Sequence, residues 1–423
     1  MKVLVIGSGA REHALVWKLA TSPNVTKVYC SPGNAGIAQQ ATLLNVDASN
    51  PLQLAEIADK EEIDLTVVGP EAPLVAGIVD AFSRRKRRIV GPTKAAAQLE
   101  GSKIFAKEFM ARHHIPTADF TYCETPESAF DIISSGVYRF PVVLKADGLA
   151  AGKGVVIAQD AEEAFATIRR FMIDKSLGSA GTRLVIEEYL SGQEASLLVF
   201  SDGKDILPMP LAQDYKAAYE GNRGPNTGGM GAYSAAGMLP DKLLEQIISK
   251  IAEPTIAGMA DEGRPFRGVL FIGLMLTDEG PRVLEYNVRL GDPEAQAVLM
   301  RLESDLLEIL EAIVNEDLKS VRPCWSSDST VCVVMAAEGY PGTPRTGDII
   351  SGLEEATKLD GVRIFHAGTK LDEKNRYVTS AGRVLAVTAR HRALEEARKL
   401  AYKAVSTIDF PGKHYRKDIA EIR

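Results

Sequence analysis

The sequence predicts an α/β and α+β multidomain protein built from three parts. The chain opens with a strand, a glycine turn, a helix and a second strand, which is typical of a doubly wound parallel sheet. Its middle carries a glycine-rich loop between two strands, as in a two-lobed nucleotide-binding fold. From residue 329 short strands alternate with Gly and Pro turns, which indicates a small C-terminal α+β domain.

The composition is ordinary for a soluble globular protein. The chain has 423 residues, a net charge of −7, 45% hydrophobic and 25% charged residues, and this length suggests about two to four domains. A mildly acidic chain is unlike a nucleic-acid binder, whose surface is basic. We find no secretory signal and no apolar run that would span a bilayer, so we expect a cytoplasmic protein without membrane or nucleic-acid partners.

Neither the cysteines nor the histidines show metal-ligand spacing. Cys30, Cys123, Cys324 and Cys332 lie far apart in the chain, and the six histidines form no close group. We therefore expect buried, reduced thiols and no metal site made from His and Cys.

The first hundred residues begin a doubly wound sheet. We expect a strand at residues 2–6, a turn at Gly7-Ser8-Gly9, a helix at 10–20 and a strand at 27–30. A dinucleotide site is disfavoured, because Arg11 stands in the stretch that lacks the third glycine and no acid follows the second strand. The helix N-terminus can still receive a phosphate or carboxylate.

Glu71 follows the next expected strand, residues 64–68, at the edge where open α/β sheets bind ligands. An ordinary acid at a helix N-terminus is the alternative. Residues 84–88, Arg-Arg-Lys-Arg-Arg, end an expected amphipathic helix at 73–83. Because cations are favourable at a helix C-terminus, we interpret them as a solvated helix end rather than a nucleic-acid or targeting patch.

The middle of the chain predicts a phosphate-binding lid. Ser102 is a candidate N-cap for a helix with Lys103 and Lys107 one turn apart. A strand at 140–147 carries Lys145 and leads into the glycine-rich loop (residues 148–154) and a strand at 155–158. Three residues, not four, separate the first two glycines, and Gly follows the lysine, so the loop is no Walker motif. A mobile lid over a triphosphate is favoured over an ordinary surface hairpin.

Beyond this loop the sequence predicts an adenosine site. Asp160 caps an expected helix at 161–172, and a strand at 183–188 runs into Glu187-Glu188-Tyr189-Leu190. We interpret residues 187–190 as a hinge whose backbone reads an adenine edge. Glu194 is placed to accept hydrogen bonds from ribose hydroxyls. Strands at 195–200 and 204–209 form a hairpin.

The polar residues around 285 predict a metal site. Glu285 and Asn287 stand two apart on an expected strand and therefore share a face, which presents the oxygen ligands that Mg²⁺ prefers. Arg289 continues this face with a cation suited to a carboxylate or phosphate, and the turn Gly291-Asp292-Pro293-Glu294 adds two acids. The alternative is a strand end with a solvated polar turn.

The C-terminal part is expected to close one wall of the site. We expect a helix at 305–315, strands at 330–336, 363–366 and 383–388, and a final helix at 393–408. His366 and Arg383 are candidates to approach a ribose phosphate, with core packing as the alternative.

The order of these features resembles the ATP-grasp superfamily, and the whole chain is similar to its glycinamide ribonucleotide synthetase family. The matching stretches span nearly the full length: residues 7–13, 32–36, 69–74, 99–103, 145–154, 224–234 and 283–296. Ala10 and Leu290 depart from the family pattern, and Ala10 puts in doubt only how closely a substrate approaches the first turn.

The resemblance implies an ATP-grasp central domain and a ligase. ATP, glycine and 5-phosphoribosylamine would give glycinamide ribonucleotide, ADP and phosphate through a glycyl phosphate, with Mg²⁺ or Mn²⁺, in purine synthesis. It implies an N-terminal domain at residues 1–101, an ATP-grasp domain at 102–325 with a lid lobe at about 117–192, and a C-terminal domain at 326–423. We expect a monomer.

The resemblance also implies which residues form the site. The metal ligands would be Glu285 and Asn287, and the catalytic residues Arg289, Asp214 and Lys145. ATP would be bound by Lys103, Lys145, Gly148, Gly152, Lys153, Gly154, Glu187, Glu188, Tyr189, Leu190 and Glu194. The substrates would be bound by Gly9, Arg11, Gly33, Asn34, Glu71, Asp214, Asn226, Thr227, Gly228, Gly229, Met230, Arg289, Gly291, Asp292 and Glu294.

Three other functions compete with this ligase. A different ATP-grasp ligase is opposed by the stretches at 7–13 and 224–234, and a nicotinamide-dependent dehydrogenase by the missing ribose acid. A regulator that binds nucleotide without catalysis is opposed by the intact lysines and the Glu285–Asn287 pair.

Overall fold

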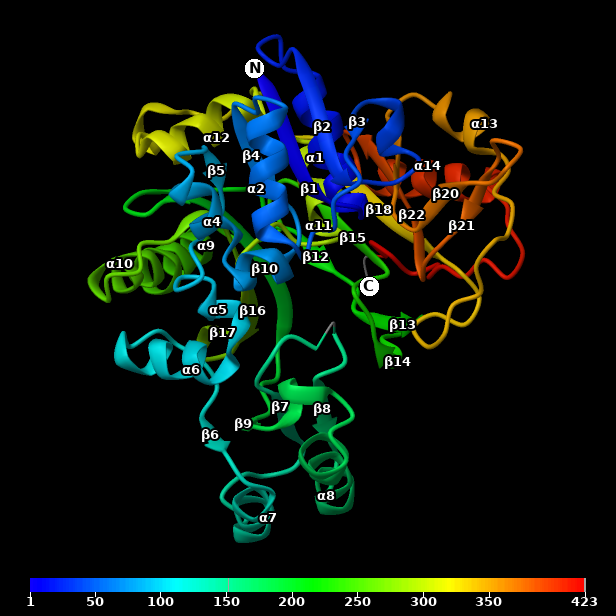
Figure 1. The fold of residues 1–423 in the computed structure, drawn as a ribbon. Coiled ribbons are helices and arrows are strands. Elements are labelled where there is room, and N and C mark those ends of the chain that lie inside the picture. Colours follow the sequence, from blue (N-terminus) through cyan, green and yellow to red (C-terminus); the bar gives the residue numbers. More distant parts are fainter. Residues whose placement is uncertain (151, 422–423) are drawn as a thin grey trace.

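The computed structural model describes residues 1–150 and 152–421. Ala151 of the glycine-rich loop and residues 422–423 of the predicted C-terminal domain lie outside the described residues. Figure 1 shows the N-terminal part (blue) beside the C-terminal part (orange and red), with a separate lobe of β6–β9, α7 and α8 extending below them. In the described residues no helix combines the length and apolar character needed to cross a membrane.

The N-terminal part is a parallel sheet of order β3-β2-β1-β4-β5, as the sequence predicts. The apolar run of β1 is almost fully buried because neighbouring strands and helices cover it on both faces. The strands are β1 (Lys2–Gly7), β2 (Lys27–Pro32), β3 (Thr42–Leu43), β4 (Leu65–Val68) and β5 (Ile89–Val90). The helices are α1 (Ala10–Ala20), α2 (Pro51–Lys60), α3 (Glu71–Ala76), α4 (Ile78–Arg84) and α5 (Gln98–Gly101).

The single helix expected at residues 73–83 is wrong. The chain forms two helices, α3 and α4, because Gly77 between them adopts a left-handed conformation with φ of +93°. The basic residues at the end of α4 make surface ion pairs: Arg85 and Arg87 both contact Asp59. This agrees with the interpretation of a solvated helix end.

The lid lobe is an antiparallel sheet of order β6-β9-β7-β8 with its own hydrophobic core. Its elements are β6 (Phe120–Cys123), α7 (Pro126–Ser135), β7 (Val142–Ala146), β8 (Val155–Ala158), α8 (Ala161–Ile168) and β9 (Leu184–Glu188). Asp160 caps α8 as predicted, since its carboxylate accepts a hydrogen bond from Glu163 N at 2.9 Å. The α-helix ends at Ile168, earlier than expected, and continues as a π-helical turn.

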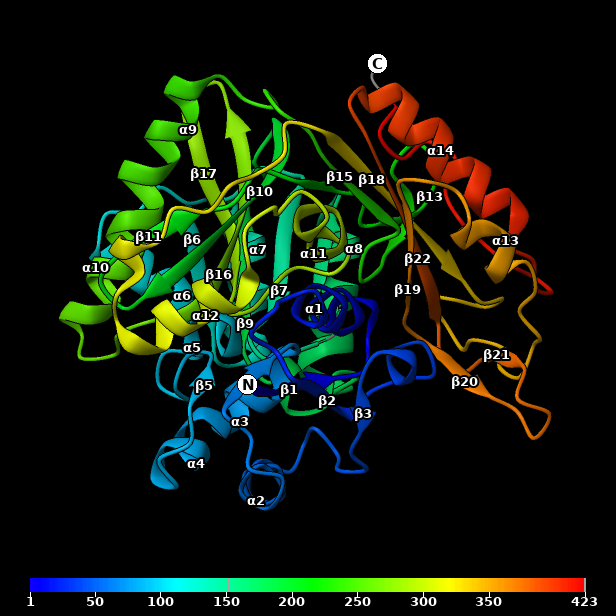
Figure 2. The same ribbon diagram turned by 90° about the horizontal axis from the view of Figure 1, so that it is seen from above.

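The central lobe is an antiparallel sheet of order β11-β10-β16-β17. Its strands are β10 (Gln193–Asp202), β11 (Ile206–Pro208), β16 (Arg267–Thr277) and β17 (Gly280–Asn287). Around it lie α6 (Lys103–Arg112), α9 (Asp241–Ile247), α10 (Glu253–Asp261), α11 (Glu294–Leu299) and α12 (Leu306–Asn315). The helices α9 and α10 share a core with one face of the sheet and α12 with the other, and Figure 2 shows α9 and α10 along its outer side. Ser102 caps α6 as predicted, since its hydroxyl accepts from Phe105 N at 3.1 Å.

The C-terminal sheet has the order β12-β15-β18-β22-β19. Its strands are β12 (Gln213–Asp214), β15 (Gly231–Ser234), β18 (Ser329–Ala336), β19 (Val362–His366) and β22 (Arg383–His391). Two short ribbons, β13 (Ala217–Tyr219) with β14 (Arg223–Asn226) and β20 (Thr369–Leu371) with β21 (Tyr377–Thr379), accompany it, together with α13 (Leu353–Thr357) and α14 (Leu394–Thr407). Thus β12 and β15 come from the predicted central domain but pair into the sheet of the C-terminal one.

Buried polar contacts join the N-terminal and C-terminal parts. His366 N donates to His13 Nδ1 at 2.8 Å, and Asn34 Nδ2 donates to the carbonyls of Ser8 and His366 at 2.8 and 2.7 Å. Both histidines are buried, and burial lowers the pKa of His13 to about 3 and that of His366 to about 4. The expectation of buried thiols is wrong for Cys324, which is exposed, and right for the other three cysteines.

Candidate active site

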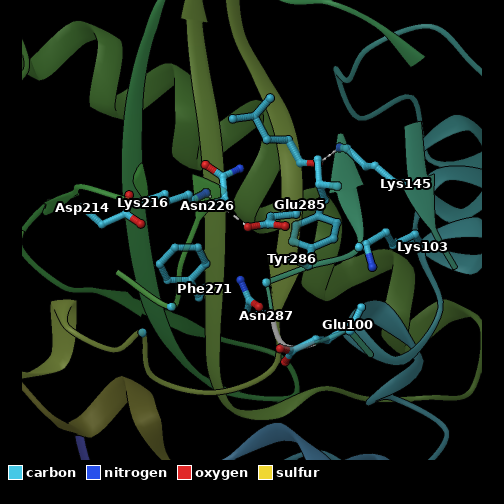
Figure 3. A pocket seen from close by; sticks show the side chains of 18 of the residues that line it. Glu100, Lys103, Lys145, Asp214, Lys216, Asn226, Phe271, Glu285, Tyr286 and Asn287 are labelled. Atoms are coloured by element: carbon cyan, nitrogen blue, oxygen red, sulfur yellow. Dashed lines mark hydrogen bonds and ion pairs between the residues drawn. The ribbon is translucent and has the colours of Figure 1, made fainter. Parts of the chain in front are cut away.

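A cavity of about 600 Å³ lies between the lid lobe and the rest of the molecule. Residues from all three predicted domains line it, among them Glu71, Lys145, Glu285 and Arg383. Figure 3 shows Glu285 near the middle, with Lys103 and Lys145 on one side and Asp214 and Lys216 on the other. The cavity therefore places the predicted nucleotide and substrate residues around one space.

The carboxylate of Glu285 faces a lysine that the sequence analysis did not select. Lys216 Nζ lies 3.3 Å from Glu285 Oε1 and 3.8 Å from Glu194 Oε2. This ammonium lowers the pKa of Glu285 to about 2, so the carboxylate stays ionised at neutral pH. Burial opposes the charge of Lys216, but Glu285, Asp214 and Glu194 together raise its pKa well above the ordinary value.

Glu285 and Asn287 offer a suitable but incomplete donor set for a divalent cation. Both line the cavity, one with an ionised carboxylate and the other with an amide oxygen. Among the described residues, no three His, Cys, Asp or Glu side chains gather into a metal-binding group. A cation held here would therefore need oxygens from a bound substrate, as phosphate-bound Mg²⁺ commonly does.

The lid side of the cavity carries a buried lysine pair around one carboxylate. Glu187 Oε2 lies 2.9 Å from Lys145 Nζ and 3.0 Å from Lys107 Nζ, and all three side chains are buried. Burial lowers the pKa of Lys107 to about 8. Lys145 Nζ also donates to Leu284 O at 2.9 Å, so this cluster joins the lid lobe to β17, the strand of Glu285.

The other carboxylate oxygen of Glu187 has no hydrogen-bond partner among the described residues. Glu187 Oε1 is buried and makes no hydrogen bond within the described residues, although a buried carboxylate oxygen normally has one. Tyr189 and Leu190 of the hinge line the same part of the cavity, with apolar walls from Val143, Ile157, Met275 and Leu284. Apolar walls with one unsatisfied acceptor among the described residues suit a base that carries an amino group.

The glycine-rich loop covers this part of the cavity from the lid lobe. Leu149, Ala150, Gly152 and Gly154 line the cavity. Gly152 has φ of +79°, and a Cβ placed on it would lie 3.2 Å from Thr227 O on the opposite wall. The loop thus reaches across to a second glycine-rich stretch, residues 224–234. Asn226, Thr227 and Gly228 of this stretch also line the cavity.

Two acids form the substrate side. Asp214 of β12 and Glu294 of α11 line the cavity, and Glu294 is only 3% exposed. Burial raises the pKa of Asp214 to about 6 and that of Glu294 to about 8. Nearby acidic side chains contribute to both increases. The Lys216 ammonium lowers the pKa of Asp214, which would otherwise be higher still.

Glu294→Gln is expected to make the stability of the folded protein less sensitive to a rise in pH between about 4.5 and 8. Between its ordinary pKa of 4.5 and about 8, Glu294 is ionised in the unfolded chain but protonated in the folded one, so stability falls as pH rises through this window. The variant lacks this loss, and its melting temperature should gain on that of the wild type up to about pH 8. The measurement is thermal melting without ligands across this range, with exposed Glu308→Gln as control. Parallel wild-type and Glu294→Gln curves would contradict the assignment.

Arg289 is held by two carboxylates. Its Nε lies 3.1 Å from Glu71 Oε2 and its Nη2 lies 3.2 Å from both Glu100 Oε1 and Asn287 Oδ1. Burial raises the pKa of Glu100 to about 7 despite this contact. Arg289 therefore links the N-terminal domain to the Glu285–Asn287 strand, and it still borders the cavity.

Arg383 forms another part of the cavity wall. It donates to Gly228 O at 2.6 Å, to Asp292 O at 2.7 Å and to Asp292 Oδ2 at 2.9 Å. Because it starts β22, this arginine brings the C-terminal sheet into the cavity wall.

The first glycine turn holds a carboxylate from its own helix. Gly9 N donates to Glu12 Oε2 at 2.5 Å, Arg11 Nε donates to Glu12 Oε1 at 2.6 Å, and a Cβ on Gly7 or Gly69 would overlap Glu12. Glu12 thus occupies the position where a phosphate could meet the helix N-terminus. Arg11 borders both the main cavity and a second one of about 500 Å³.

The structure brings most of the predicted site residues to these two cavities. Predicted residues that line neither of them are Gly33, Asn34, Gly148, Lys153, Gly229, Met230 and the buried His366, for which core packing was the alternative. Asn34 has its side-chain amide bonded within the protein, and Met230 is fully buried. Lining residues that the sequence analysis did not select include Glu12, Glu100, Lys216, Phe271 and Tyr286. A signal existed for Lys216, because it stands two residues from Asp214.

The two-lobed fold, its glycine-rich loop and the acid–amide pair on β17 define an ATP-grasp ligase, an enzyme class that uses ATP with a divalent metal ion. The chain belongs to the phosphoribosylglycinamide synthetase family. Family models match its N domain at residues 1–100, its ATP-grasp (A) domain at 101–295 and its C domain at 330–422. It is therefore an ATP-dependent ligase of purine biosynthesis.

Similar proteins cover the chain from end to end. A phosphoribosylamine–glycine ligase of Neisseria meningitidis serogroup B is 49% identical over 100% of this chain and 99% of that protein. The trifunctional purine biosynthetic protein adenosine-3 of Gallus gallus is 51% identical over 99% of this chain and 42% of that protein. The crystal structure of phosphoribosylamine–glycine ligase from Thermotoga maritima has a TM-score of 0.86 at 34% identity and covers 99% of this chain and 100% of that one.

Proposed function

We propose that this chain joins glycine to 5-phosphoribosylamine, giving glycinamide ribonucleotide, ADP and phosphate. The single observation that carries this proposal is the position of Glu285, between the Lys103–Lys145 side and the Asp214–Lys216 side of one cavity. A ligase that activates a carboxylate with ATP needs nucleotide, metal and acceptor amine within reach of one another.

The lid side fits ATP. Lys103 and Lys145 would hold the α- and β-phosphates, with the glycine-rich loop above them, including Gly148, Lys153 and Gly154. The free Oε1 of Glu187 would accept a hydrogen bond from the adenine amino group, while the backbone of Glu188, Tyr189 and Leu190 reads the base edge. Glu194 would accept from the ribose hydroxyls.

Glu285 and Asn287 would hold the divalent ion, for which Mg²⁺ is proposed, with Mn²⁺ as a substitute. When bound, the ion neutralises charge on the β- and γ-phosphates. Lys216 stands beside Glu285 at 3.3 Å, so it supplies a second cation for the transferred phosphoryl group.

The chemistry then runs in two steps. A glycine carboxylate oxygen attacks the γ-phosphorus and ADP leaves, which forms glycyl phosphate. The amine of phosphoribosylamine attacks the glycyl carbonyl carbon, phosphate leaves, and the amine loses a proton. Asp214, whose pKa of about 6 leaves it largely ionised near neutral pH, is suited to bind the substrate ammonium and to accept that proton, whereas Glu294, with a pKa of about 8, is mostly protonated there.

The remaining predicted substrate residues frame the acceptor. Arg289 and Glu71 would orient glycine or the sugar, and Arg11 and Arg383 would approach its phosphate. Gly9, Gly33, Asn34, Asn226, Thr227, Gly228, Gly229, Met230, Gly291 and Asp292 stay proposed substrate-side residues, some of them through backbone support. We further propose the predicted domain boundaries, a cytoplasmic location and a monomer.

The deciding experiment is ADP release by the purified protein with ATP, Mg²⁺ and phosphoribosylamine, with and without glycine. We expect ADP release that depends on both glycine and the amine. ADP release independent of glycine would contradict the proposal and point to a different ATP-grasp ligase.

Gly152→Pro should impair closure of the glycine-rich loop. Proline requires φ near −65°, whereas Gly152 has φ of +79° and faces Thr227 O. We expect kcat/KM for ATP to fall by about tenfold or more, because incomplete closure misplaces the reacting groups. Gly178→Pro is the control, because that glycine also has a positive φ, of +59°, in the same lobe, and a Cβ on it would meet nothing within 4 Å. Equal kinetics for the two variants would mean that the loop is not a lid.

A further inference from the structure

The hairpin of β13 and β14 carries cavity residues at both of its ends. Lys216 immediately precedes β13, and Asn226 ends β14; both line the cavity. The backbone N–H and the hydroxyl of Thr227 both donate to Lys216 O at 2.8 Å, which closes the base of the hairpin. The placement of this hairpin therefore sets where the Lys216 ammonium stands relative to Glu285.

Residues 414–420 run along the hairpin and do not line the cavity. The His414 ring N–H donates to Ala218 O at 2.8 Å, and Ala420 N donates to the Tyr215 hydroxyl at 2.9 Å. Asp418 Oδ2 accepts from Gly221 N in the hairpin turn at 2.9 Å. This segment, called the support segment below, thus contacts the hairpin from its base to its turn.

Arg416 is the central residue of the support segment. It is 1% exposed and donates to Ala217 O at 3.1 Å and to Asn222 Oδ1 at 3.0 Å. Both oxygens of Asp418 accept from it at 2.7 Å, and its guanidinium lies 4.9 Å from the ring centroid of Tyr215. A buried arginine with four acceptors and an aromatic neighbour is held rigidly.

Asp214 and Lys216 line the cavity, whereas Tyr215 between them packs into the C-terminal core and against Arg416. Successive residues of an extended chain point to opposite sides. The catalytic side and the Arg416 side are therefore two faces of one short segment, residues 214–216, which leads from β12 to β13, so a shift on one face moves the other.

We propose that Arg416 is a positioning residue for the ligase reaction, which acts through Tyr215, Ala217 and Asn222 to hold Asp214 and Lys216 in place. Arg416 lines neither cavity, so its effect on the reaction is indirect. The inference rests on the proposed function, in which Lys216 faces the transferred phosphoryl group.

The test compares Arg416→Gln with Arg398→Gln in the glycine-dependent ADP assay, alongside melting curves. Arg398 is the matched control, because it donates to Ile419 O at 3.0 Å and Lys417 O at 2.7 Å of the same segment, with no hydrogen bond to the hairpin. We expect Arg416→Gln to lower kcat by about 10- to 100-fold at a temperature where it is fully folded, since small misplacements of reacting groups have effects of that size. The KM for ATP should stay unchanged, and Arg416→Lys should recover part of kcat.

The possible results separate the role of Arg416 from the proposed function. Full kcat in folded Arg416→Gln, or an equal fall in Arg398→Gln, would overturn the inference. If Arg416→Gln does not fold, Tyr215→Leu replaces it, because it removes the ring and hydroxyl on the hairpin side, and the same criteria apply. A wild type without glycine-dependent ADP release would contradict the proposed function itself, whereas an active wild type with an unaffected variant contradicts only the role of Arg416.

Discussion

Glu285→Gln is expected to lower kcat by about 10²- to 10³-fold, the usual effect of losing one preorganised electrostatic group. Glutamine keeps the shape but loses the charge that a divalent ion and Lys216 both require. Wild-type Glu285 has a pKa of about 2, so the charge is present at every pH at which the enzyme would be assayed. The measurement is steady-state ADP release at saturating ATP over a range of Mg²⁺ concentrations.

Glu279→Gln is the matched control for Glu285→Gln. Glu279 lies in the turn that leads into β17, where its exposed carboxylate pairs with Arg282. Its removal should leave kcat and the Mg²⁺ dependence unchanged. Near-normal turnover of Glu285→Gln would remove Glu285 from the site.

Glu187→Gln is expected to weaken both ATP binding and the lid lobe. One oxygen of Glu187 pairs with Lys107 and Lys145, and breaking a buried ion pair by removing one partner costs about 3–5 kcal/mol. The amide also offers an N–H₂ group where an acceptor for the adenine amino group is needed. We expect a lower melting temperature and a Kd for ATP raised by about 100-fold, measured by calorimetry.

The adjacent residue provides the control for Glu187→Gln. Glu188 is about a third exposed and pairs with Arg282 at 2.9 Å, so Glu188→Gln should change stability and ATP affinity little. Comparable losses in both variants would mean that the effect belongs to the hinge charge as a whole rather than to the buried cluster.

Local patterns predicted the elements and the pair on β17 well. The apolar run of β1 and the spacing of Glu285 and Asn287 are properties of a few consecutive residues, so the sequence shows them directly. Gly77 shows the limit, because a helix pattern continued through it and only the structure reveals its left-handed conformation.

The missed residues depend on contacts between distant parts of the chain. Glu100 and Arg289 form an ion pair although 189 positions of the chain separate residue 289 from residue 100. No spacing rule connects residues so far apart. Lys216 comes shortly after β12, a strand of only two residues. The pairing of β12 with the distant strand β15 fixes the course of the chain there. Glu12 was not selected because one of its partners is the backbone N–H of Gly9 at the helix start, which no pattern of side chains marks, and the other is the adjacent Arg11.

The mixed origin of the C-terminal sheet has a consequence for biosynthesis. The edge strand β12 pairs with β15, and β15 pairs on its other side with β18, which the ribosome makes only after α12. A nascent chain stopped before residue 329 could fold its parallel sheet and lid lobe, yet β15 would expose an open edge, a template for aggregation. Competence for catalysis would therefore arrive late in translation, when β18 and residues 414–420 emerge and dock.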